Sequence, residues 1–233
     1  MPGAEDLSAA LLRLDEITRR LRRDCPWDRE QDERSIVPHT IEEAYELADA
    51  AHAGDDEKLL DELGDVLFQV YFLSLLLEER GRGDLAAVAE HCRMKLIRRH
   101  PHVFGSRAAE TAGDVVRNWT AIKREEERGG EVFGSIPDTH PATIHARKVQ
   151  RRAENAGLAG ERDAGEALGD IRRLGDSFFS ARGWESDEES FRRIGELLWD
   201  AVAAARALGV DPEVALREHA NRVRREIEEA SAR

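Results

Sequence analysis

The stretch TIEEAYELADAAHAGDDEKLLDELGDVLFQVYFLSLLLEER, residues 40–80, predicts two helices joined by a tight turn. Thr40 followed by Glu43 has the pattern of a capping box, so the first helix is expected to begin near Thr40 and to end at about His52. The residues AGDD (53–56) are typical of a turn that ends one helix and caps the next. The second helix is expected over about 57–80. Its apolar residues from 66 to 77 cover nearly every direction around the axis, which indicates a helix buried on all sides.

Helical patterns continue on both sides of this pair. Residues 5–23 place large aliphatic side chains on one face, and DCPWD (24–28) interrupts that helix. A further helix is expected over 85–99, ending at HPHVFG (100–105). No stretch alternates convincingly with period two, so the predicted fold class is all-α. The short connections favour an antiparallel helical bundle.

The overall charge and the cysteine content exclude several classes of protein. The chain has 233 residues and a formal net charge of −13. Nucleic acids and anionic membrane surfaces require basic faces, so neither is an expected partner. The two cysteines are too few for a disulfide framework, which fits a reducing, cytoplasmic location. The N-terminus lacks the pattern of a signal peptide, and the apolar run 66–77 is too short to cross a bilayer.

Four acidic residues form two pairs with helical spacing in the opening stretch: Glu43 with Glu46, and Glu62 with Asp65. Antiparallel packing can bring the pairs together. Converging carboxylates would raise one another's pKa unless a divalent cation joined them. Ligands that are all oxygen favour Mg²⁺, or Mn²⁺ in its place, over zinc. Two simpler interpretations stay open: the first pair could form a solvated helix face, and the second could lie in a wet first turn where the helix dipole favours acids.

The main basic cluster near the acidic pairs lies in KLIRRHPH (95–102). Lys95, Arg98 and Arg99 can share one face of the helix over 85–99 and could meet the phosphates of a substrate held by the cation. The plainer alternative is an ordinary positively charged helix C-terminus.

Other single residues carry weaker signals. Trp27 could lie over a nucleobase, although a tryptophan that fills a loop is more often structural. His100 and His102 lack a third partner and are not predicted as metal ligands. Gly64 is expected to allow close helix packing.

The sequence contains an internal repeat. DELGDVLFQV (61–70) lines up with RRIGELLWDA (192–201), and DLAAVAEHCRMKLIRR (84–99) lines up with DPEVALREHANRVRRE (211–226). The repeat predicts two related helical halves. VFGSIPDTHPAT (132–143), which contains two prolines, is the predicted boundary between them.

EEAYE (42–46) followed by DELGD (61–65) resembles the EExxE…ExxD signature of the MazG family, the all-α nucleoside triphosphate pyrophosphohydrolases. The flanking segments CPWDREQ (25–31) and KLIRRHPHVFG (95–105) resemble the same family. The segment 136–158, IPDTHPATIHARKVQRRAENAGL, resembles the bridge into a second MazG-like half. Together these segments extend the resemblance over nearly the whole chain.

This resemblance implies a helical bundle that assembles as a homodimer or a higher homo-oligomer, with Mg²⁺ as its cofactor. It implies hydrolysis of nucleoside triphosphates to a nucleoside monophosphate and pyrophosphate, as in housecleaning of standard and non-standard nucleotides. It also implies that Glu42 is a base-like or second-layer group and that Lys95 meets the phosphates. The implied metal ligands are Glu43, Glu46, Glu62 and Asp65.

The second half departs from this signature. RRIGE (192–196) takes the place of DELGD, and RRLGD (172–176) is interpreted as the counterpart of EEAYE. Arginines at 172, 173 and 193 would then replace acids, so this half is expected to bind no metal. We therefore predict a catalytic domain over 1–117, a linker with a short charged helix over 118–143, and a degenerate second domain over 144–233.

Two other functions remain open from the sequence. The chain could be a catalytically silent bundle that senses nucleotides or binds a partner, which the altered second half favours. It could also be a related phosphohydrolase with a specialised substrate such as phosphoribosyl-ATP or dUTP, which the flanking sequence disfavours.

Overall fold

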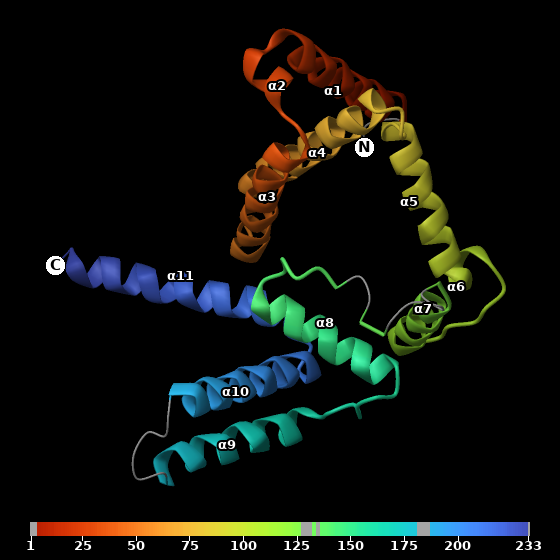
Figure 1. Ribbon diagram of the computed structural model, residues 1–233. Coiled ribbons are helices and arrows are strands. Elements are labelled where there is room, and N and C mark those ends of the chain that lie inside the picture. The colour runs from red at the N-terminus through yellow and green to blue at the C-terminus, as the bar shows by residue number, and fades with distance from the viewer. Residues whose placement is uncertain (1–3, 127–131, 134–135, 181–186, 233) are drawn as a thin grey trace. The chain divides into compact units, whose positions relative to one another are not determined.

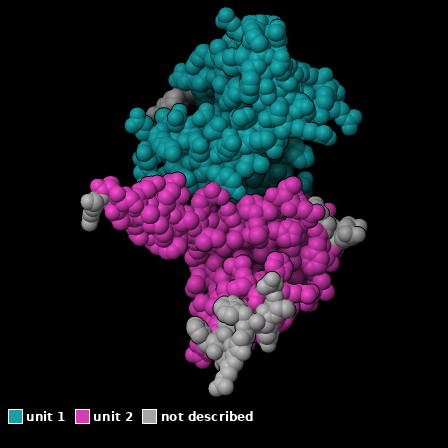
Figure 2. Space-filling model, turned by 60° about the vertical axis from the view of Figure 1, so that its left-hand side comes forward, with its two compact units in different colours: residues 1–115 teal, residues 116–233 magenta. Residues whose placement is uncertain are grey.

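The computed structural model describes residues 4–126, 132–133, 136–180 and 187–232. These residues form helices and connecting segments with no strand, which confirms the all-α prediction (Figure 1). The chain divides into two compact units, residues 1–115 (unit 1) and 116–233 (unit 2), which Figure 2 draws in different colours. None of the described helices combines the length and apolar character of a membrane span.

Unit 1 holds the helices that the opening stretch and its neighbours predict. The expected helix over 85–99 is confirmed, and the segment DCPWD contains a short helix rather than a plain break. The helices are α1 (Ala4–Asp24), α2 (Pro26–Glu30), α3 (Glu33–Ala53), α4 (Asp56–Glu79), α5 (Leu85–Arg99) and α6 (Pro101–Phe104). Helix α7 (Ala112–Glu126) runs across the boundary between the units, and residues 127–130 of the predicted charged helix lie outside the described residues.

Helix α3 begins at Glu33, so the predicted start near Thr40 is wrong. The side chain of Asp32 accepts hydrogen bonds from the backbone amides of Arg34 and Ser35, and the Ser35 hydroxyl accepts one from the Asp32 amide. This capping box satisfies the free amides at the helix start. Pro38 lies inside the helix. It removes one backbone donor, yet the helix continues through it.

A sharp turn sets α3 and α4 side by side. Gly54 adopts the left-handed conformation with φ of 69°, which costs a glycine little, and its amide donates to the Ala50 carbonyl. The side chain of Asp55 then accepts a hydrogen bond from the Lys58 amide and caps α4. The turn therefore has the sequence position that AGDD predicts, and it returns the chain along α3.

The core of unit 1 joins α3 to the second half of α4. Ile36, Phe72 and Leu76 are its buried members. Helix α1 is held against α4 by two ion pairs between side chains, Arg19 with Glu78 at 2.7 Å and Arg22 with Glu79 at 2.8 Å. The guanidinium of Arg22 also lies 5.8 Å from the centre of the Phe72 ring.

One face of α4 stays open within a single chain. Leu60, Leu63, Leu67 and Val70 follow helical spacing and are 74, 50, 37 and 41 % exposed. We call these four residues the α4 stripe. The prediction that this helix is buried on all sides is therefore wrong for one chain.

Unit 2 repeats the α3–α4 arrangement with a constant shift. It contains α8 (Ala142–Asn155), α9 (Ala164–Ser180), α10 (Asp187–Ala207) and α11 (Pro212–Ser231). Helices α9 and α10 pack together as α3 and α4 do, and α9 begins at position 164, which is 131 positions after the start of α3 at 33. Residues 181–186, which include Gly183 and Trp184, lie outside the described residues.

Local details of unit 2 follow the same shift. Asp163 and Glu166 form a reciprocal cap at the start of α9, at the positions that match Asp32 and Ser35. Buried Ala167 and Ala203 likewise match Ile36 and Phe72 in the core of unit 1. The alignment of RRLGD (172–176) with EEAYE (42–46) is therefore one residue out of register.

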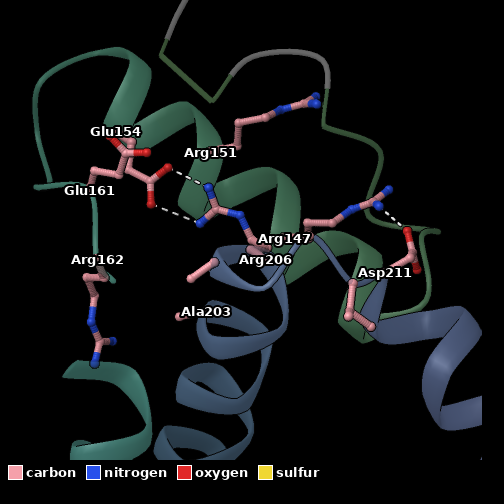
Figure 3. A pocket seen from close by; sticks show the side chains of 11 residues that line it. Arg147, Arg151, Glu154, Glu161, Arg162, Ala203, Arg206 and Asp211 are labelled. Carbon is pink, nitrogen blue, oxygen red and sulfur yellow. Dashed lines mark hydrogen bonds and ion pairs between the residues drawn. The ribbon is translucent and has the colours of Figure 1, made fainter. Parts of the chain in front are cut away.

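Arginine–carboxylate pairs hold α8 to the end of α10 and the start of α11. Arg206 donates to both carboxylate oxygens of Glu154, one of them at 2.9 Å, and Arg147 pairs with Asp211. These pairs surround a cavity of about 370 Å³ (Figure 3). In this view the guanidinium groups of Arg206 and Arg147 point toward the carboxylates of Glu154 and Asp211, so these pairs join elements that lie far apart in the sequence.

The cap of α3 gives a test of where that helix begins. Asp32→Ala is expected to lower the free energy of unfolding by about 1 kcal/mol, because two amides lose their acceptor. Urea denaturation followed by circular dichroism measures the change. Asp32→Asn keeps a capping oxygen and should stay close to the wild type. An unchanged stability for Asp32→Ala would contradict a helix start at this residue.

Candidate metal centre of unit 1

Three of the predicted acids converge where α3 faces the first half of α4. One carboxylate oxygen from each of Glu43, Glu62 and Asp65 lies within 4.8 Å of the other two. Glu43 is half-buried, Glu62 is only 5 % exposed, and Asp65 is exposed. We call these three residues the acidic cluster. It is the one such group of potential metal ligands found in the described part of the chain.

The cluster is electrostatically unfavourable without a cation. Burial raises the pKa of Glu43, and the neighbouring charges of Asp65, Glu46 and Glu62 raise it further. Burial and the charge of Glu46 likewise raise the pKa of Glu62. Glu46 is therefore close enough to act on the cluster, although it does not belong to the group of three.

Lysine 58 offsets only part of this repulsion. Its Nζ lies 3.8 Å from Glu62, and the side chain of Lys58 is 50 % exposed. One exposed ammonium group at this distance gives little stabilisation. Sequence reasoning missed Lys58, although its spacing of four residues before Glu62 on a helix could have indicated the contact.

Glu42, the first acid of the motif, does not join the cluster but faces the α2 side of α3. Its carboxylate lies 3.3 Å from Nδ1 of His39, and the His39 ring meets Trp27 edge-on with ring centres 5.9 Å apart. Trp27 is 51 % exposed, so its ring is open to a ligand. The sequence indicated Trp27 and Glu42 separately and missed His39, which connects them.

The alternative that the first pair forms a plain solvated face fits Glu46 but not Glu43. Glu46 is exposed, whereas Glu43 is half-buried beside Glu62 and Asp65 of α4. The alternative of a wet first turn fails for Glu62, which is buried in the second turn of α4. Whether the cluster binds a metal ion stays a prediction.

The predicted basic residues do not meet the acidic cluster within one chain. Helix α5 leaves the C-terminal end of α4 and runs away from the α3–α4 pair (Figure 1). It buries none of its residues in unit 1. Lys95, Arg98 and Arg99 occupy its last two turns, so a phosphate contact from them requires a second chain or a movement of α5.

Space remains open beside the cluster. A side chain begun at Gly64 would meet no atom within 4 Å, so the prediction that Gly64 serves close helix packing is wrong for a single chain. A glycine inside a helix costs roughly 0.5–1 kcal/mol relative to alanine. Thr40, the predicted cap, instead lies inside α3 and donates a hydrogen bond of 3.3 Å to buried Gln69 on α4.

Unit 2 lacks this set of ligands. The shift of 131 positions places Leu174, Ser177, Arg193 and Glu196 where unit 1 has Glu43, Glu46, Glu62 and Asp65. Arg173 matches Glu42, and Arg172 matches Ile41 rather than an acid, which corrects the predicted pairing. Of these four positions in unit 2, only Glu196 carries a carboxylate.

The arrangement in unit 1 suits a hard divalent cation. Carboxylate oxygens from two helices are the ligands that Mg²⁺ and Mn²⁺ accept, and Mg²⁺ commonly completes its coordination with water and phosphate oxygens. Asp65 is exposed and Glu43 is half-buried, so two of the three donors are accessible to solvent, while Glu62 is buried. The residues present therefore fit such an ion.

Comparison with known proteins identifies relatives of the whole arrangement. Residues 31–104 match the model of the MazG nucleotide pyrophosphohydrolase domain, a span that contains the acidic cluster and Lys95. The chain is 36 % identical over 210 residues to a nucleoside triphosphate pyrophosphohydrolase of Escherichia coli, covering 88 % of this chain and 80 % of the relative.

Two further relatives are also named as nucleoside triphosphate pyrophosphohydrolases. The nucleoside triphosphate pyrophosphohydrolase/pyrophosphatase MazG of Thermotoga maritima is 35 % identical over 195 residues, which are 83 % of this chain and 73 % of the relative. A nucleoside triphosphate pyrophosphohydrolase of Mycobacterium tuberculosis is 34 % identical over 141 residues, 60 % of this chain and 43 % of the relative.

The raised pKa of Glu62 predicts how pH acts on stability when a chelator removes cations. A carboxyl group whose pKa is raised by folding destabilises the fold above that pKa and not below its ordinary value of 4.5. Glu62→Gln removes the charge and keeps the shape. It should therefore raise the melting temperature at about pH 8 and lose this advantage at about pH 4.

Differential scanning calorimetry in EDTA measures the effect. Glu57→Gln, which removes an exposed carboxylate in the first turn of α4, is the control and should not gain stability with rising pH. Equal pH dependence of the two variants would contradict a repulsive cluster.

Proposed function

The chain belongs to the MazG family of nucleoside triphosphate pyrophosphohydrolases, and from this premise we propose that unit 1 hydrolyses nucleoside triphosphates at the acidic cluster. The products are a nucleoside monophosphate and pyrophosphate. The observation that carries the proposal is the approach of Glu43, Glu62 and Asp65 within 4.8 Å in the span that matches the family. Three carboxylates of one sign in such a space call for a divalent cation.

The acidic cluster and Glu46 would hold Mg²⁺, with Mn²⁺ as a possible substitute. The bound ion would neutralise triphosphate charge and lower the pKa of a water molecule. In the reaction, the oxygen of water bonds to one of the two phosphorus atoms that share the α–β bridging oxygen. The bond between that phosphorus and the bridging oxygen breaks, and the products are the monophosphate and pyrophosphate. The proton lost by water needs an acceptor near the cluster.

Glu42 is suited to accept that proton. It is exposed, next in sequence to Glu43, and close to His39, which can stabilise the carboxylate or pass the proton on. Trp27, in contact with the same histidine, offers an open aromatic surface to the base of the nucleotide. A surface of this kind accepts many bases, which suits housecleaning of standard and non-standard nucleotides.

Loss of the ligand charge should remove activity without loss of the fold. Asp65→Asn and Glu46→Gln are each expected to lower the rate of pyrophosphate release by about a hundredfold or more, because a metal ligand becomes neutral. Release of monophosphate and pyrophosphate from a panel of nucleoside triphosphates with Mg²⁺ is the measurement. Glu57→Gln should keep the wild-type rate.

The same assay separates the enzyme from a silent nucleotide sensor. Binding of nucleoside triphosphate and Mg²⁺ without any product would favour the sensor. Release of orthophosphate in place of pyrophosphate would contradict the proposed reaction. Activity confined to dUTP or phosphoribosyl-ATP would favour a specialised phosphohydrolase.

We further propose that the active form is a homodimer in which α5 of one chain brings Lys95 to the cluster of the other. Two observations support this. The α4 stripe is an exposed apolar surface of the kind that marks an interface. Helix α5 buries none of its residues and carries exposed Val88, Met94 and Leu96, so it also offers apolar side chains to a partner. A Lys95 ammonium group would bind a phosphate oxygen.

Mixing two inactive variants tests the exchange of Lys95. Glu43→Gln destroys the cluster and Lys95→Ala removes the ammonium group. In a mixed dimer, the chain with an intact cluster receives Lys95 from its partner. Co-refolding equal amounts should restore about one quarter of wild-type activity, because half of the dimers are mixed and each has one complete site.

The control is each variant refolded alone, which should stay inactive. If Lys95 served its own chain, no mixed dimer would contain a complete site and no activity would return. Analytical ultracentrifugation of the mixture confirms that dimers have formed.

A further inference from the structure

A cavity in unit 2 lies at the place that corresponds to the acidic cluster of unit 1. It has a volume of about 600 Å³ and is bounded by one face of α9 and one face of α10. Its lining includes Arg173, Leu174, Ser177, Gly195, Glu196 and Trp199. With the shift of 131 positions, these residues match Glu42, Glu43, Glu46, Gly64, Asp65 and Phe68 of unit 1. Unit 2 has therefore kept a space at this place although the metal ligands are gone.

The charges around this space are reversed rather than simply lost. Lys58 pairs with Glu62 in unit 1, and the matching pair in unit 2 is Glu189 with Arg193, with Arg193 Nε 2.7 Å from the carboxylate. His39 lies beside Glu42, and the matching pair is Asp170 with Arg173. The contacts keep their positions while acid and base exchange places.

A third acid follows the same rule. Asp61 of unit 1 is matched by Arg192, which also lines the cavity. Acids at 42, 61 and 62 are thus replaced by arginines at 173, 192 and 193. A site built to attract a cation has become one that presents guanidinium groups, and guanidinium groups bind phosphate in a bidentate manner.

The arginines at the cavity can exchange their present partners for a ligand. The side chains of Arg173 and Arg192 are 76 and 56 % exposed, and exposed ion pairs contribute little stability. When Arg173 turns to a ligand, Asp170 keeps a second partner in Arg162. Arg162 also donates to buried Asp200 at 2.6 Å, so Asp200 stays paired. Arg192 pairs with Glu189 and with Glu196, which also lines the cavity, and Glu189 keeps Arg193 as a second partner when Arg192 turns to a ligand.

The walls of the cavity suit a planar, apolar group beside the anion. Trp199 replaces Phe68 of unit 1 and is 38 % exposed, and Leu174 lies on the facing helix where unit 1 has Glu43. An indole ring stacks on nucleobases without strong preference for one of them.

Both units keep a glycine where a side chain would enter this space. A side chain begun at Gly195 would meet no atom within 4 Å, as at Gly64. Glycine costs stability inside a helix. Its presence at the same position in both units leaves the two spaces open.

We propose that the α9–α10 cavity is a second nucleotide site that binds a nucleoside monophosphate without a divalent cation. Arg173 and Arg192 hold the phosphate group, and Trp199 stacks on the base. One phosphate group carries a charge that two guanidinium groups can balance. A triphosphate carries more negative charge than these two guanidinium groups can balance. Nucleoside monophosphates are also the products of the proposed function of unit 1, but the residues that would bind the ligand all lie in unit 2.

The test measures binding of AMP to the full chain in EDTA. The chain carries Asp65→Asn, which removes one ligand of the acidic cluster in unit 1. Isothermal titration calorimetry should give one site per chain for AMP, and weaker binding for inorganic phosphate or adenosine alone. Arg173→Ala combined with Arg192→Ala should weaken AMP binding by about tenfold or more. Arg224→Ala, an exposed arginine on α11 outside the cavity, is the control and should bind AMP normally.

A matched pair of glycine substitutions separates the two sites. Gly195→Leu places a larger side chain in the cavity from a position where a Cβ would meet no atom within 4 Å, so it should abolish AMP binding in EDTA and leave pyrophosphate release unchanged. Gly64→Leu should have the opposite effects. Both variants should keep wild-type helicity by circular dichroism.

Three results would overturn the proposal. They are the absence of AMP binding in EDTA, AMP binding that survives both the double arginine substitution and Gly195→Leu, and AMP binding that Gly64→Leu removes. A failure of the proposed hydrolysis would appear separately, as missing pyrophosphate release in a protein that still binds AMP in EDTA.

Discussion

The α3–α4 pair must hold three carboxylates close together against their mutual repulsion. The core formed by Ile36, Phe72 and Leu76 fixes the two helices, and the fixed helices hold Glu43 against Glu62 and Asp65. Apolar burial thus stabilises an arrangement that the charges alone would oppose. The raised pKa values of Glu43 and Glu62 report this conflict. A bound cation would turn the same arrangement into a favourable one.

The two units show how one backbone frame can carry opposite electrostatics. The start of the first helix, its cap and the buried core positions are shifted by the same 131 residues, because capping geometry and core packing leave little freedom. The ion pairs beside the site are under no such restriction. Their members can exchange sign as long as each charge keeps a partner, as in the pairs Lys58–Glu62 and Glu189–Arg193.

The third property of the fold is an apolar surface that stays exposed within a single chain. The α4 stripe and α5 leave apolar side chains in water within a single chain, while α1 is held against the C-terminal end of α4 by the ion pairs of Arg19 and Arg22. The second unit exposes matching residues on α10, among them Phe191, Ile194 and Leu198. Two residues of the acidic cluster, Glu62 and Asp65, lie on the same helix as the α4 stripe, so one helix carries both candidate metal ligands and the exposed apolar surface.

The sequence by itself determined the helical class, the turn between α3 and α4, the repeat and the acids that converge, because periodicity, capping residues and spacing are local signals. It placed the start of α3 seven residues late, because the pattern at Thr40 competed with the true cap at Asp32 and Pro38 stood between them. Tertiary structure alone decided that Glu62 is buried while Leu63 is exposed, that His39 connects Trp27 with Glu42, and that α5 points away from the cluster. It also fixed the register of the second unit, because only packing identifies which of two neighbouring residues faces the core.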